Sequence, residues 1–545
     1  MPQPGKPVRP VQSARPAQPA RPVVLICEEL SPATMAALGP DADVRHVAGT
    51  DRAALLAALP EADAVLVRSA TRIDAEAVAA GARLKVIGRA GVGLDNVDVT
   101  AASRAGVMVV NAPTSNIVSA AELTVGMLLA VARNIPQADA ALKAGQWQRS
   151  RFTGVELADK TLGIIGLGRI GTLVARRMAA FGMNLVAYDP YVQPERAAEL
   201  GIRTAGLADV LAVSDFLTVH LPRTPETAGL IGFDALHQVK PSVRIVNVAR
   251  GGIVDEAELY AALKEGRVAG AALDVFATEP CTDSPLFELD NVVVTPHLGA
   301  GTSEAQERAG VAVARSVRQA LAGRFVPEAV NVRLGTVDAG LDPWLALTER
   351  LGRLFTATAG TLPATLRVEI SADVARHGAS ALELAALKGA LTGVVEGGVS
   401  YVNAPLIAKE RSITTASTVF DAARALIRVL GSLPSGAEVS VAATLTGLPG
   451  GERLLEVGGF EVDLPLPGNI ALLRAPDGAG VIGGVSDVLG RAGIPITALH
   501  LAHTPAAPGE VLVALSTAVP VPEDVLTDAA ARIDATRNWF LEQTG

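Results

Sequence analysis

The chain has 545 residues, 49% of them hydrophobic, with 47 basic against 56 acidic residues and a net charge of −9. This length predicts three or four domains, and the mild acidity without a long run of one sign argues against non-specific nucleic-acid binding. The cysteines, Cys27 and Cys281, form neither a CxxC pair nor a metal-ligand spacing, which suits a reducing compartment and predicts no metal site.

The first 22 residues, MPQPGKPVRPVQSARPAQPARP, are rich in Pro, Arg and Ala. Because they lack the apolar centre of a signal peptide, we expect a disordered tail over residues 1–22. No apolar stretch approaches the ~18–20 residues that a membrane span needs. We therefore expect a cytoplasmic protein that binds a small molecule and neither nucleic acid nor membrane.

Short apolar segments alternate with helical segments after the tail. The apolar segments are VVLICEE, ADAVLVRSA, LKVIGRAG and VMVVNAP. Strands that alternate with helices predict a parallel sheet. We assign residues 23–118 to a substrate-binding α/β domain of the doubly wound, flavodoxin-like type. A helix from about Thr302 to Ala322 is expected to return to it, so that residues 302–330 complete the domain.

A long helix from about Ser119 to Arg133 leads into a second α/β domain, residues 119–301. Its expected strands are TLGII, NLVAYDP, DFLTVHLP, RIVNVAR, VAGAALDVF and NVVVTPH. Six strands with helices between them are typical of a doubly wound, Rossmann-like dinucleotide domain. Because the chain crosses between the two domains twice, we expect a cleft between them.

Beyond residue 330 the pattern changes. Residues 331–467 mix helices such as LALTERLGRLF with strands such as TLRVEIS and RLLEVGGFEVDL, which predicts an α+β domain without a catalytic constellation. Residues 468–545 follow the order strand, helix, strand, strand, helix. A module of that kind more often senses a ligand or dimerises than catalyses a reaction.

One glycine-rich segment has the pattern of a dinucleotide site. Gly166, Gly168 and Gly171 fit GxGxxG between the apolar TLGII and the helical TLVARRMAAFG. Glycines there let the backbone approach a pyrophosphate, and a helix N-terminus offers free amides. Asp189 lies 18 residues beyond the last glycine, where a carboxylate binds ribose hydroxyls and repels a 2′-phosphate. The pattern predicts NAD rather than NADP; a tight turn without nucleotide is the alternative.

Three later strands of this domain end in polar side chains, at the edge where such sheets bind ligands. Arg250 follows RIVNVA, Glu279 follows ALDVFAT, and His297 ends VVVTPH. A dehydrogenase needs an acid/base, a group that tunes it and a cation that holds the substrate. We predict His297 as the acid/base, Glu279 as the carboxylate that raises its pKa and Arg250 as the clamp.

Each of these three residues could instead be structural, and the sequence offers a second histidine. His220 also ends a strand, in LTVHLPRTPET, and is the rival acid/base. No carboxylate follows it at comparable spacing, so we expect His220 to line the cofactor pocket.

Several of these segments resemble the D-2-hydroxyacid dehydrogenases: LGIIGLGRIG, NVARGGIVDE, ALDVFATEPCTDSPLF and TPHLGAGTSEAQ. Within that family, IGRAGVGLDNVD and NAPTSNIVSAAELT resemble the phosphoglycerate dehydrogenases. The segment LKGALTGVVEGGVSYVNAPLIAKERSI and the C-terminal module look like the intervening domain and the βαββαβ-type ACT domain of the long form. The resemblance covers nearly everything after the tail.

The resemblance implies NAD-dependent oxidation of 3-phospho-D-glycerate to 3-phosphohydroxypyruvate, the first step of phosphorylated serine biosynthesis, by a homotetramer. His297 would take the hydroxyl proton with support from Glu279, and Arg250 would hold the substrate carboxylate. The implied cofactor contacts are Gly166, Gly168, Arg169, Ile170, Gly171, Asp189, Val248, Ala249, Arg250, Asp274, His297, Leu298, Gly299 and Ala300. The implied substrate contacts are Arg68, Ser69, Asn111 and Arg250.

A phosphate dianion needs several cationic partners. Arg68, Arg72 and Arg89 are the candidates, and ordinary surface arginines are the alternative interpretation of all three.

The C-terminal module departs from the ACT domains that sense serine, which carry an Asp-x-Pro-Gly loop and an Asn at the second strand. Asp477 is kept, but Gly478-Ala479 follows it and Pro495 stands where the Asn would be. Proline offers neither a side-chain amide nor a backbone donor. We expect serine inhibition to be weak or absent, with the module dimerising or sensing another effector, such as an amino acid.

Two other functions stay open. One is a dehydrogenase for another D-2-hydroxy acid, or a reductase of 2-oxoglutarate. The other is an NAD-sensing corepressor or scaffold with an idle site, against which the complete set of Arg250, Glu279 and His297 argues. Substituting His297 separates the classes, since an enzyme should lose ~10²–10⁴-fold in rate or more.

Overall fold

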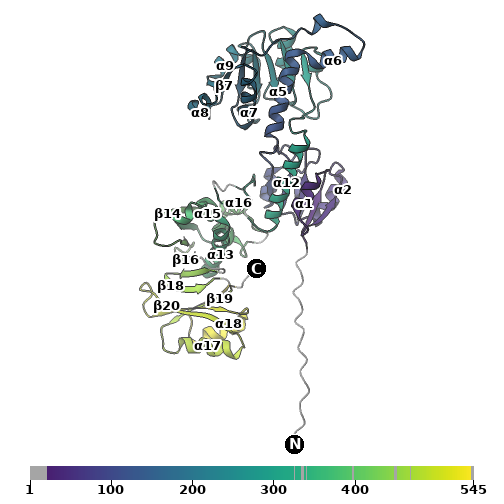
Figure 1. Cartoon of the computed structure of the whole chain (residues 1–545). Coiled ribbons are helices and arrows are strands. Elements are labelled where there is room, and N and C mark those ends of the chain that lie inside the picture. Colours follow the sequence, from purple (N-terminus) through teal and green to yellow (C-terminus); the bar gives the residue numbers. More distant parts are fainter. Residues whose placement is uncertain are drawn as a thin grey trace.

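The computed structural model describes residues 21–324, 326–332, 337–338, 340–395, 398–446, 451–466 and 468–541. The predicted tail, residues 1–22, therefore lies outside the described residues except for its last two positions. Four separate sheets follow one another along the chain, and Figure 1 shows the lobes that they form. The two α/β lobes meet at a narrow waist, and the two C-terminal lobes extend to one side.

The first sheet is parallel, with the flavodoxin-like order β2-β1-β3-β4-β5. Its strands are β1 (Val23–Ile26), β2 (Asp43–His46), β3 (Ala64–Val67), β4 (Val86–Arg89) and β5 (Met108–Val110). Its own helices are α1 (Pro32–Leu38), α2 (Arg52–Ala58), α3 (Ala75–Ala80) and α4 (Val99–Arg104). β2 escaped prediction because its sequence DVRH is polar and lies at the exposed edge of the sheet.

The predicted return helix is α12 (Ser303–Leu321), which packs on the first sheet against α1 and β4. The contact is close at Gly88 in β4, where an added Cβ would come within 2.6 Å of Val313. Helix α12 thus brings the chain back to its first sheet. It places the end of the second lobe beside the start of the first.

The second sheet is also parallel, with the Rossmann-type order β12-β11-β10-β9-β6-β7-β8. Its strands are β6 (Thr161–Ile165), β7 (Asn184–Tyr188), β8 (Arg203–Thr204), β9 (Phe216–Val219), β10 (Arg244–Asn247), β11 (Gly270–Leu273) and β12 (Val292–Val294). It is covered by α5 (Ile117–Arg133), α7 (Arg169–Ala179), α8 (Pro194–Ala198), α9 (Leu207–Val213), α10 (Phe233–Leu236) and α11 (Glu256–Lys264). The six expected strands are present; the additional strand, β8, has only two residues and leaves no periodic signal.

Helix α5 is a core helix, with Thr124, Leu128 and Ala132 fully buried. Among the described residues no single helix is long and apolar enough to span a membrane. Among the same residues, α5 and α6 (Ile135–Lys143) would be long and apolar enough only if taken together, and the chain bends by 63° between them.

The third sheet is mixed, with the order β14-β13-β15-β16-β17-β18. Its strands are β13 (Thr365–Ser371), β14 (Thr414–Phe420), β15 (Ile427–Ser432), β16 (Glu438–Leu445), β17 (Glu452–Val457) and β18 (Phe460–Pro465). Its helices are α13 (Leu341–Ala359), α14 (Ala372–Ala375), α15 (Ala379–Leu391) and α16 (Ala404–Glu410). The segment RLLEVGGFEVDL is a hairpin that turns at Gly458 and Gly459, both with positive φ, rather than one strand.

The fourth sheet is antiparallel, with the order β20-β21-β19-β22. Its elements are β19 (Asn469–Pro476), α17 (Val481–Arg491), β20 (Ile496–His503), β21 (Glu510–Thr517), α18 (Glu523–Arg532) and β22 (Arg537–Leu541). This βαββαβ sequence confirms the predicted fold class. Asp477, in the loop before α17, lies 3.3 Å from Nε2 of His503, and the expectation about serine stays a prediction.

Candidate active site

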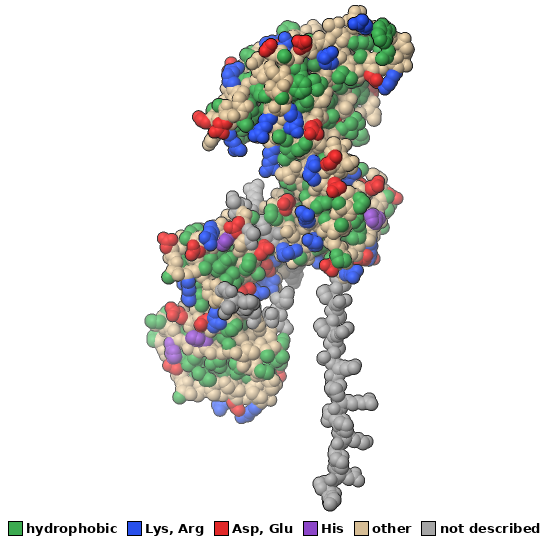
Figure 2. Space-filling model, in the orientation of Figure 1, with side chains coloured by type: hydrophobic (Ala, Val, Ile, Leu, Met, Phe, Trp, Pro, Cys, Tyr) green, Lys and Arg blue, Asp and Glu red, His purple; other side chains and the backbone are tan. Residues whose placement is uncertain are grey.

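The carboxyl ends of the two parallel sheets face each other. Arg250, beyond the end of β10, reaches Gly93, beyond the end of β4: a Cβ added to Gly93 would lie 3.0 Å from Nη2 of Arg250. On the face shown in Figure 2, Lys and Arg side chains gather on the lower edge of the upper lobe, toward the waist. The loop after β10 and the loop after β4 therefore approach each other where the two lobes meet.

The glycine-rich turn between β6 and α7 fits a dinucleotide pyrophosphate. Gly166 has φ 95°, and a Cβ there would come within 2.8 Å of the carbonyl oxygen of His220. A Cβ on Gly171 would come within 2.2 Å of the Gly166 oxygen, whereas one on Gly168 would meet no described atom within 4 Å. Gly168 is the N-cap of α7 and supplies no capping side chain, so the first amides of the helix stay available to an anion.

Asp189, just beyond the end of β7, is tied to the same turn. Its Oδ2 accepts from the backbone N–H of Leu167 at 2.8 Å, and its Oδ1 accepts from that of Tyr191 at 2.9 Å. Each carboxylate oxygen keeps a lone pair for a ribose hydroxyl. A cavity of about 870 Å³ opens beside this turn and is lined by Gly168, Arg169, Thr172 and Tyr191, among others.

His220, the rival base, lies behind the glycine-rich turn. Its Nε2 is 3.1 Å from Oγ1 of Thr218, and a Cβ on Gly171 would lie 3.5 Å from its ring. Burial lowers the pKa of His220 to about 4, so its imidazole is neutral near pH 7. The expectation that His220 lines the cofactor pocket fits this position beside the GxGxxG turn.

The predicted pair of His297 and Glu279 is assembled from two loops. Nδ1 of His297 lies 2.7 Å from Oε2 of Glu279, and Oε1 of Glu279 accepts from the N–H of Phe276 at 3.0 Å. The hydrogen bond to Glu279, reinforced by that carboxylate's charge, raises the pKa of His297 despite partial burial. For Glu279, burial favours the neutral acid, but the bonds from His297 and Phe276 outweigh it and lower the pKa. The two side chains thus lie in contact, and the roles assigned to them stay a prediction.

Asp274, at the end of β11, holds the loop that carries His297. Its Oδ1 accepts from the hydroxyl of Thr295 and the N–H of Leu298, both at 2.6 Å, and its Oδ2 accepts from Gly299 N–H at 2.9 Å. The side chain is fully buried, and burial raises the pKa of Asp274 although these donors oppose the shift. Asp274 was predicted as a cofactor contact; the structure shows it bracing the loop from within.

Other predicted cofactor residues surround this loop. Gly299 packs against Val248, since a Cβ on Gly299 would lie 3.5 Å from the Val248 side chain. Leu298 is 45% exposed, and Ala300 is exposed as well. Ile170 in α7 packs instead on the core of the second lobe. Cofactor binding by these residues stays a prediction.

Three arginines come close to one another where the two lobes meet. Arg89 ends β4, and its pKa is lowered by burial and by the nearby charges of Arg250 and Arg68, against the pull of Asp95 and Glu28. The buried Nε of Arg89 has no hydrogen-bond partner among the described residues. Arg250 lies close enough to influence the pKa of His297 as well. We call Arg68, Arg89 and Arg250 the arginine cluster.

The structure does not bring every predicted substrate residue into this cluster. Arg72 is 80% exposed, and its Nε lies 4.0 Å from Oδ2 of Asp74. Asn111 donates from Nδ2 to the carbonyl oxygen of Val92 at 2.6 Å and so holds the loop after β4. Ser69, in the loop after β3, is exposed. Among the described residues there is no group of three or more His, Cys, Asp or Glu that could hold a metal.

Comparisons with known proteins fit this architecture. Residues 125–299 match the D-isomer specific 2-hydroxyacid dehydrogenase, NAD binding domain, and residues 340–447 match the D-3-phosphoglycerate dehydrogenase intervening domain. D-3-phosphoglycerate dehydrogenase of Mycobacterium tuberculosis is 52% identical over 94% of this chain and 98% of its own length. The chain belongs to the D-3-phosphoglycerate dehydrogenase family.

More distant relatives differ in how much of this chain they match. D-3-phosphoglycerate dehydrogenase of Methanocaldococcus jannaschii is 39% identical over 92% of this chain and 96% of its own length. The crystal structure of a glyoxylate reductase from Paecilomyes thermophila is 29% identical with a TM-score of 0.52, and covers 57% of this chain and 98% of its own. Relatives that share the D-3-phosphoglycerate dehydrogenase name thus match over nearly the full chain, whereas the reductase matches little more than half.

The glycine-rich turn gives a test of the NAD site in this D-3-phosphoglycerate dehydrogenase. We predict that Gly168→Ala leaves the thermal midpoint nearly unchanged, because the new Cβ meets no described atom, but weakens NADH binding at least ~10-fold by crowding the pyrophosphate. Fluorescence titration with NADH measures the affinity. Gly206→Ala, at the N-cap of α9, is the matched control. Equal NADH affinity in both variants would contradict this placement of the cofactor.

The imidazole–carboxylate pair gives a second test. The charge of Glu279 favours the imidazolium form, so Glu279→Gln should lower the pKa of His297 toward its ordinary value. NMR titration of the ring C–H signals measures this shift. Glu256→Gln is the control, because Glu256 accepts from the nearby Ala277 N–H and not from the imidazole. An unchanged His297 titration in Glu279→Gln would overturn the electrostatic account of the pair.

Proposed function

We propose that the protein oxidises 3-phospho-D-glycerate to 3-phosphohydroxypyruvate with NAD, the first step of phosphorylated serine biosynthesis. The observation that carries this proposal is the arginine cluster, whose Arg250 lies close to the His297–Glu279 pair. The substrate carries a carboxylate and a phosphate, and both are anionic near pH 7. Relatives named D-3-phosphoglycerate dehydrogenase, at 52% identity over 94% of the chain, support the same substrate.

The arginine cluster suits two anionic groups better than one. Arg89 is largely withdrawn from water, and no carboxylate hydrogen-bonds its guanidinium among the described residues. A buried cation without a partner is costly, so an anion that enters the cluster gains charge-assisted hydrogen bonds at sites already deprived of water. We assign the substrate carboxylate to Arg250, beside the imidazole, and the phosphate to Arg68 and Arg89 across the cleft.

His297 is arranged to take the hydroxyl proton. Its Nδ1 is engaged by Glu279, which leaves Nε2 as the unprotonated nitrogen of the neutral ring. The Glu279 carboxylate then stabilises the imidazolium that forms when the proton arrives. When bound, NAD supplies the acceptor for the hydride that leaves C2. Arg250 holds the substrate carboxylate and stabilises the oxygen at C2.

The rest of the chain fits this role. We propose that residues 23–118 with 302–330 form the substrate-binding domain, residues 119–301 the NAD-binding domain, residues 331–467 the intervening domain and residues 468–545 the ACT domain. A homotetramer in the cytoplasm stays part of the proposal. Another D-2-hydroxy acid is the second candidate, because the glyoxylate reductase, at 29% identity, covers 57% of this chain. The arginine cluster favours the phosphorylated acid over it.

Substrate comparison tests this proposal. Purified protein with NAD should form NADH from 3-phospho-D-glycerate with kcat/KM at least ~10²-fold above that for D-glycerate or D-lactate, since each charge-assisted bond to the phosphate adds ~1.5–3 kcal/mol. Arg89→Gln should remove most of this preference. Arg72→Gln, at the exposed arginine, should keep it. Preference for an unphosphorylated acid, or equal effects of the two substitutions, would contradict the assignment.

A further inference from the structure

The loop Arg68–Thr71, directly after β3, is held by the carboxylate of Glu28. Oε1 of Glu28 accepts from the N–H groups of Arg68 at 2.8 Å and Thr71 at 3.0 Å. Oε2 accepts from the N–H of Ala70 at 3.3 Å. Glu28 lies just beyond β1, the strand that pairs with β3. One side chain on the neighbouring strand thus binds three of the four amides of this loop.

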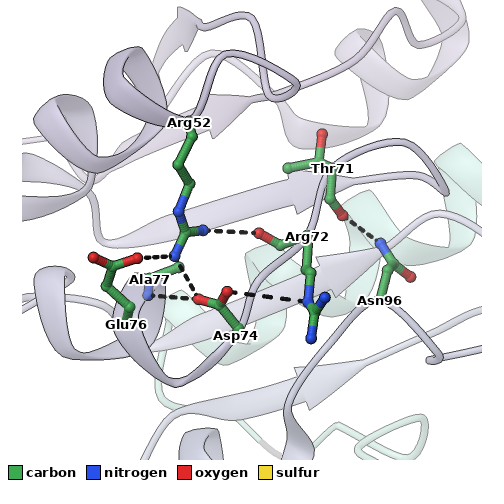
Figure 3. Close-up of polar contacts among 7 residues, drawn as sticks. All are labelled: Arg52, Thr71, Arg72, Asp74, Glu76, Ala77 and Asn96. Atoms are coloured by element: carbon green, nitrogen blue, oxygen red, sulfur yellow. Dashed lines mark hydrogen bonds and ion pairs between the residues drawn. The ribbon is translucent and has the colours of Figure 1, made fainter.

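The carbonyl groups of the same loop are held by Asn96. Its Nδ2 donates to the carbonyl oxygen of Arg68 at 2.6 Å and to that of Thr71 at 2.5 Å. Figure 3 shows the second of these bonds. A carboxylate can only accept from N–H groups, and an amide nitrogen can only donate to carbonyl groups. Glu28 and Asn96 therefore hold Arg68 and Thr71 in complementary ways, from the segments after β1 and β4.

The outer end of the loop is fixed separately. Arg52 donates to the carbonyl oxygen of Arg72 at 3.4 Å and pairs with Asp74 at 2.6 Å and Glu76 at 2.5 Å (Figure 3). Beyond it, the N–H of Ile73 donates to the carbonyl oxygen of Asn96 at 2.9 Å. The loop is thus closed at both ends before any ligand binds.

Burial explains these bonds only in part. Thr71 is fully buried, so its backbone N–H and carbonyl groups need partners, but Ser69 and Ala70 are exposed and water could solvate the amide of Ala70 at little cost. The side chains of Arg68 and Ser69 hydrogen-bond no other described residue. The backbone of the loop is held while these two side chains remain available, which is the arrangement expected of a preorganised binding loop.

We propose that Glu28 and Asn96 are positioning residues for the substrate: by fixing the Arg68–Thr71 backbone, they set Arg68 and Ser69 toward the phosphate. The inference rests on the proposed function, because it needs a phosphorylated substrate at Arg68. Although Glu28 is anionic, its oxygens are directed to backbone amides rather than to the cleft. Its charge also lies close enough to Arg89 to offset part of the repulsion within the arginine cluster.

Asn96→Ala and Glu28→Ala test this inference in the full-length protein. Each should raise KM for 3-phospho-D-glycerate at least ~10-fold, because a misplaced binding group loses much of its effect. The kcat and its pH dependence should change little, since His297 and Glu279 belong to the second lobe, beyond the ends of β12 and β11. Glu28→Gln keeps one acceptor oxygen for Arg68 and Thr71 and should restore part of the lost affinity. NADH binding confirms that the second lobe is folded.

Asn331 provides the matched control. It lies at the opposite end of the same sheet, where its Nδ2 donates to the Val107 oxygen at 2.9 Å and its Oδ1 accepts from the Val109 N–H at 2.9 Å. Asn331→Ala should lower the thermal midpoint without changing KM. Equal KM values in Asn96→Ala and Asn331→Ala would overturn the positioning role and leave the proposed function intact. If the wild-type protein makes no NADH from 3-phospho-D-glycerate, the proposed function and this inference both fall.

Discussion

The buried carboxylate of Asp274 fixes the backbone from which His297 meets Glu279. His297 has φ 56°, a left-handed conformation that few residues other than glycine adopt without cost. Asp274 stabilises it from beneath, through the hydroxyl of Thr295 and the amides of Leu298 and Gly299. The imidazole is thereby turned toward Glu279, and its Nε2 is left for a substrate. Without this brace, the parallel sheet would still form, but the imidazole proposed as proton acceptor would lack a defined direction.

The second requirement is a set of cations that form no ion pair among the described residues, although the charges of Asp95 and Glu28 act on Arg89. Each arginine of the cluster follows or ends a parallel strand, Arg68 after β3, Arg89 in β4 and Arg250 after β10. Parallel strands present their carboxyl ends at one edge, so two such sheets facing each other concentrate these side chains in one cleft. The same geometry brings positive charge close to an imidazole whose pKa Glu279 raises, and an anionic substrate would relieve the resulting repulsion.

Much of this arrangement could be predicted from sequence, because strand ends carry a readable signal. An apolar run that stops at Arg250 or His297 indicates both a strand and the edge of the sheet at which ligands are expected to bind. The short strands β2 and β8 gave no such signal. Strand β2 is polar and exposed, and strand β8 has only two residues. The sequence also could not tell which of Arg72 and Arg89 belongs to the arginine cluster, since only the fold shows that Arg72 is exposed and Arg89 is largely buried. Glu28 and Asn96 act on backbone groups of a distant loop, which leaves no local pattern.

The measurement that tests this account most directly is calorimetric titration of the NADH-saturated protein with 3-phospho-D-glycerate and with D-glycerate. NADH blocks turnover, so the two affinities report the cleft itself. The account predicts that the phosphorylated acid binds at least ~10-fold more tightly, with an advantage that shrinks as salt is added. Equal affinities at low salt would show that the arginine cluster does not bind the phosphate, and would contradict the account.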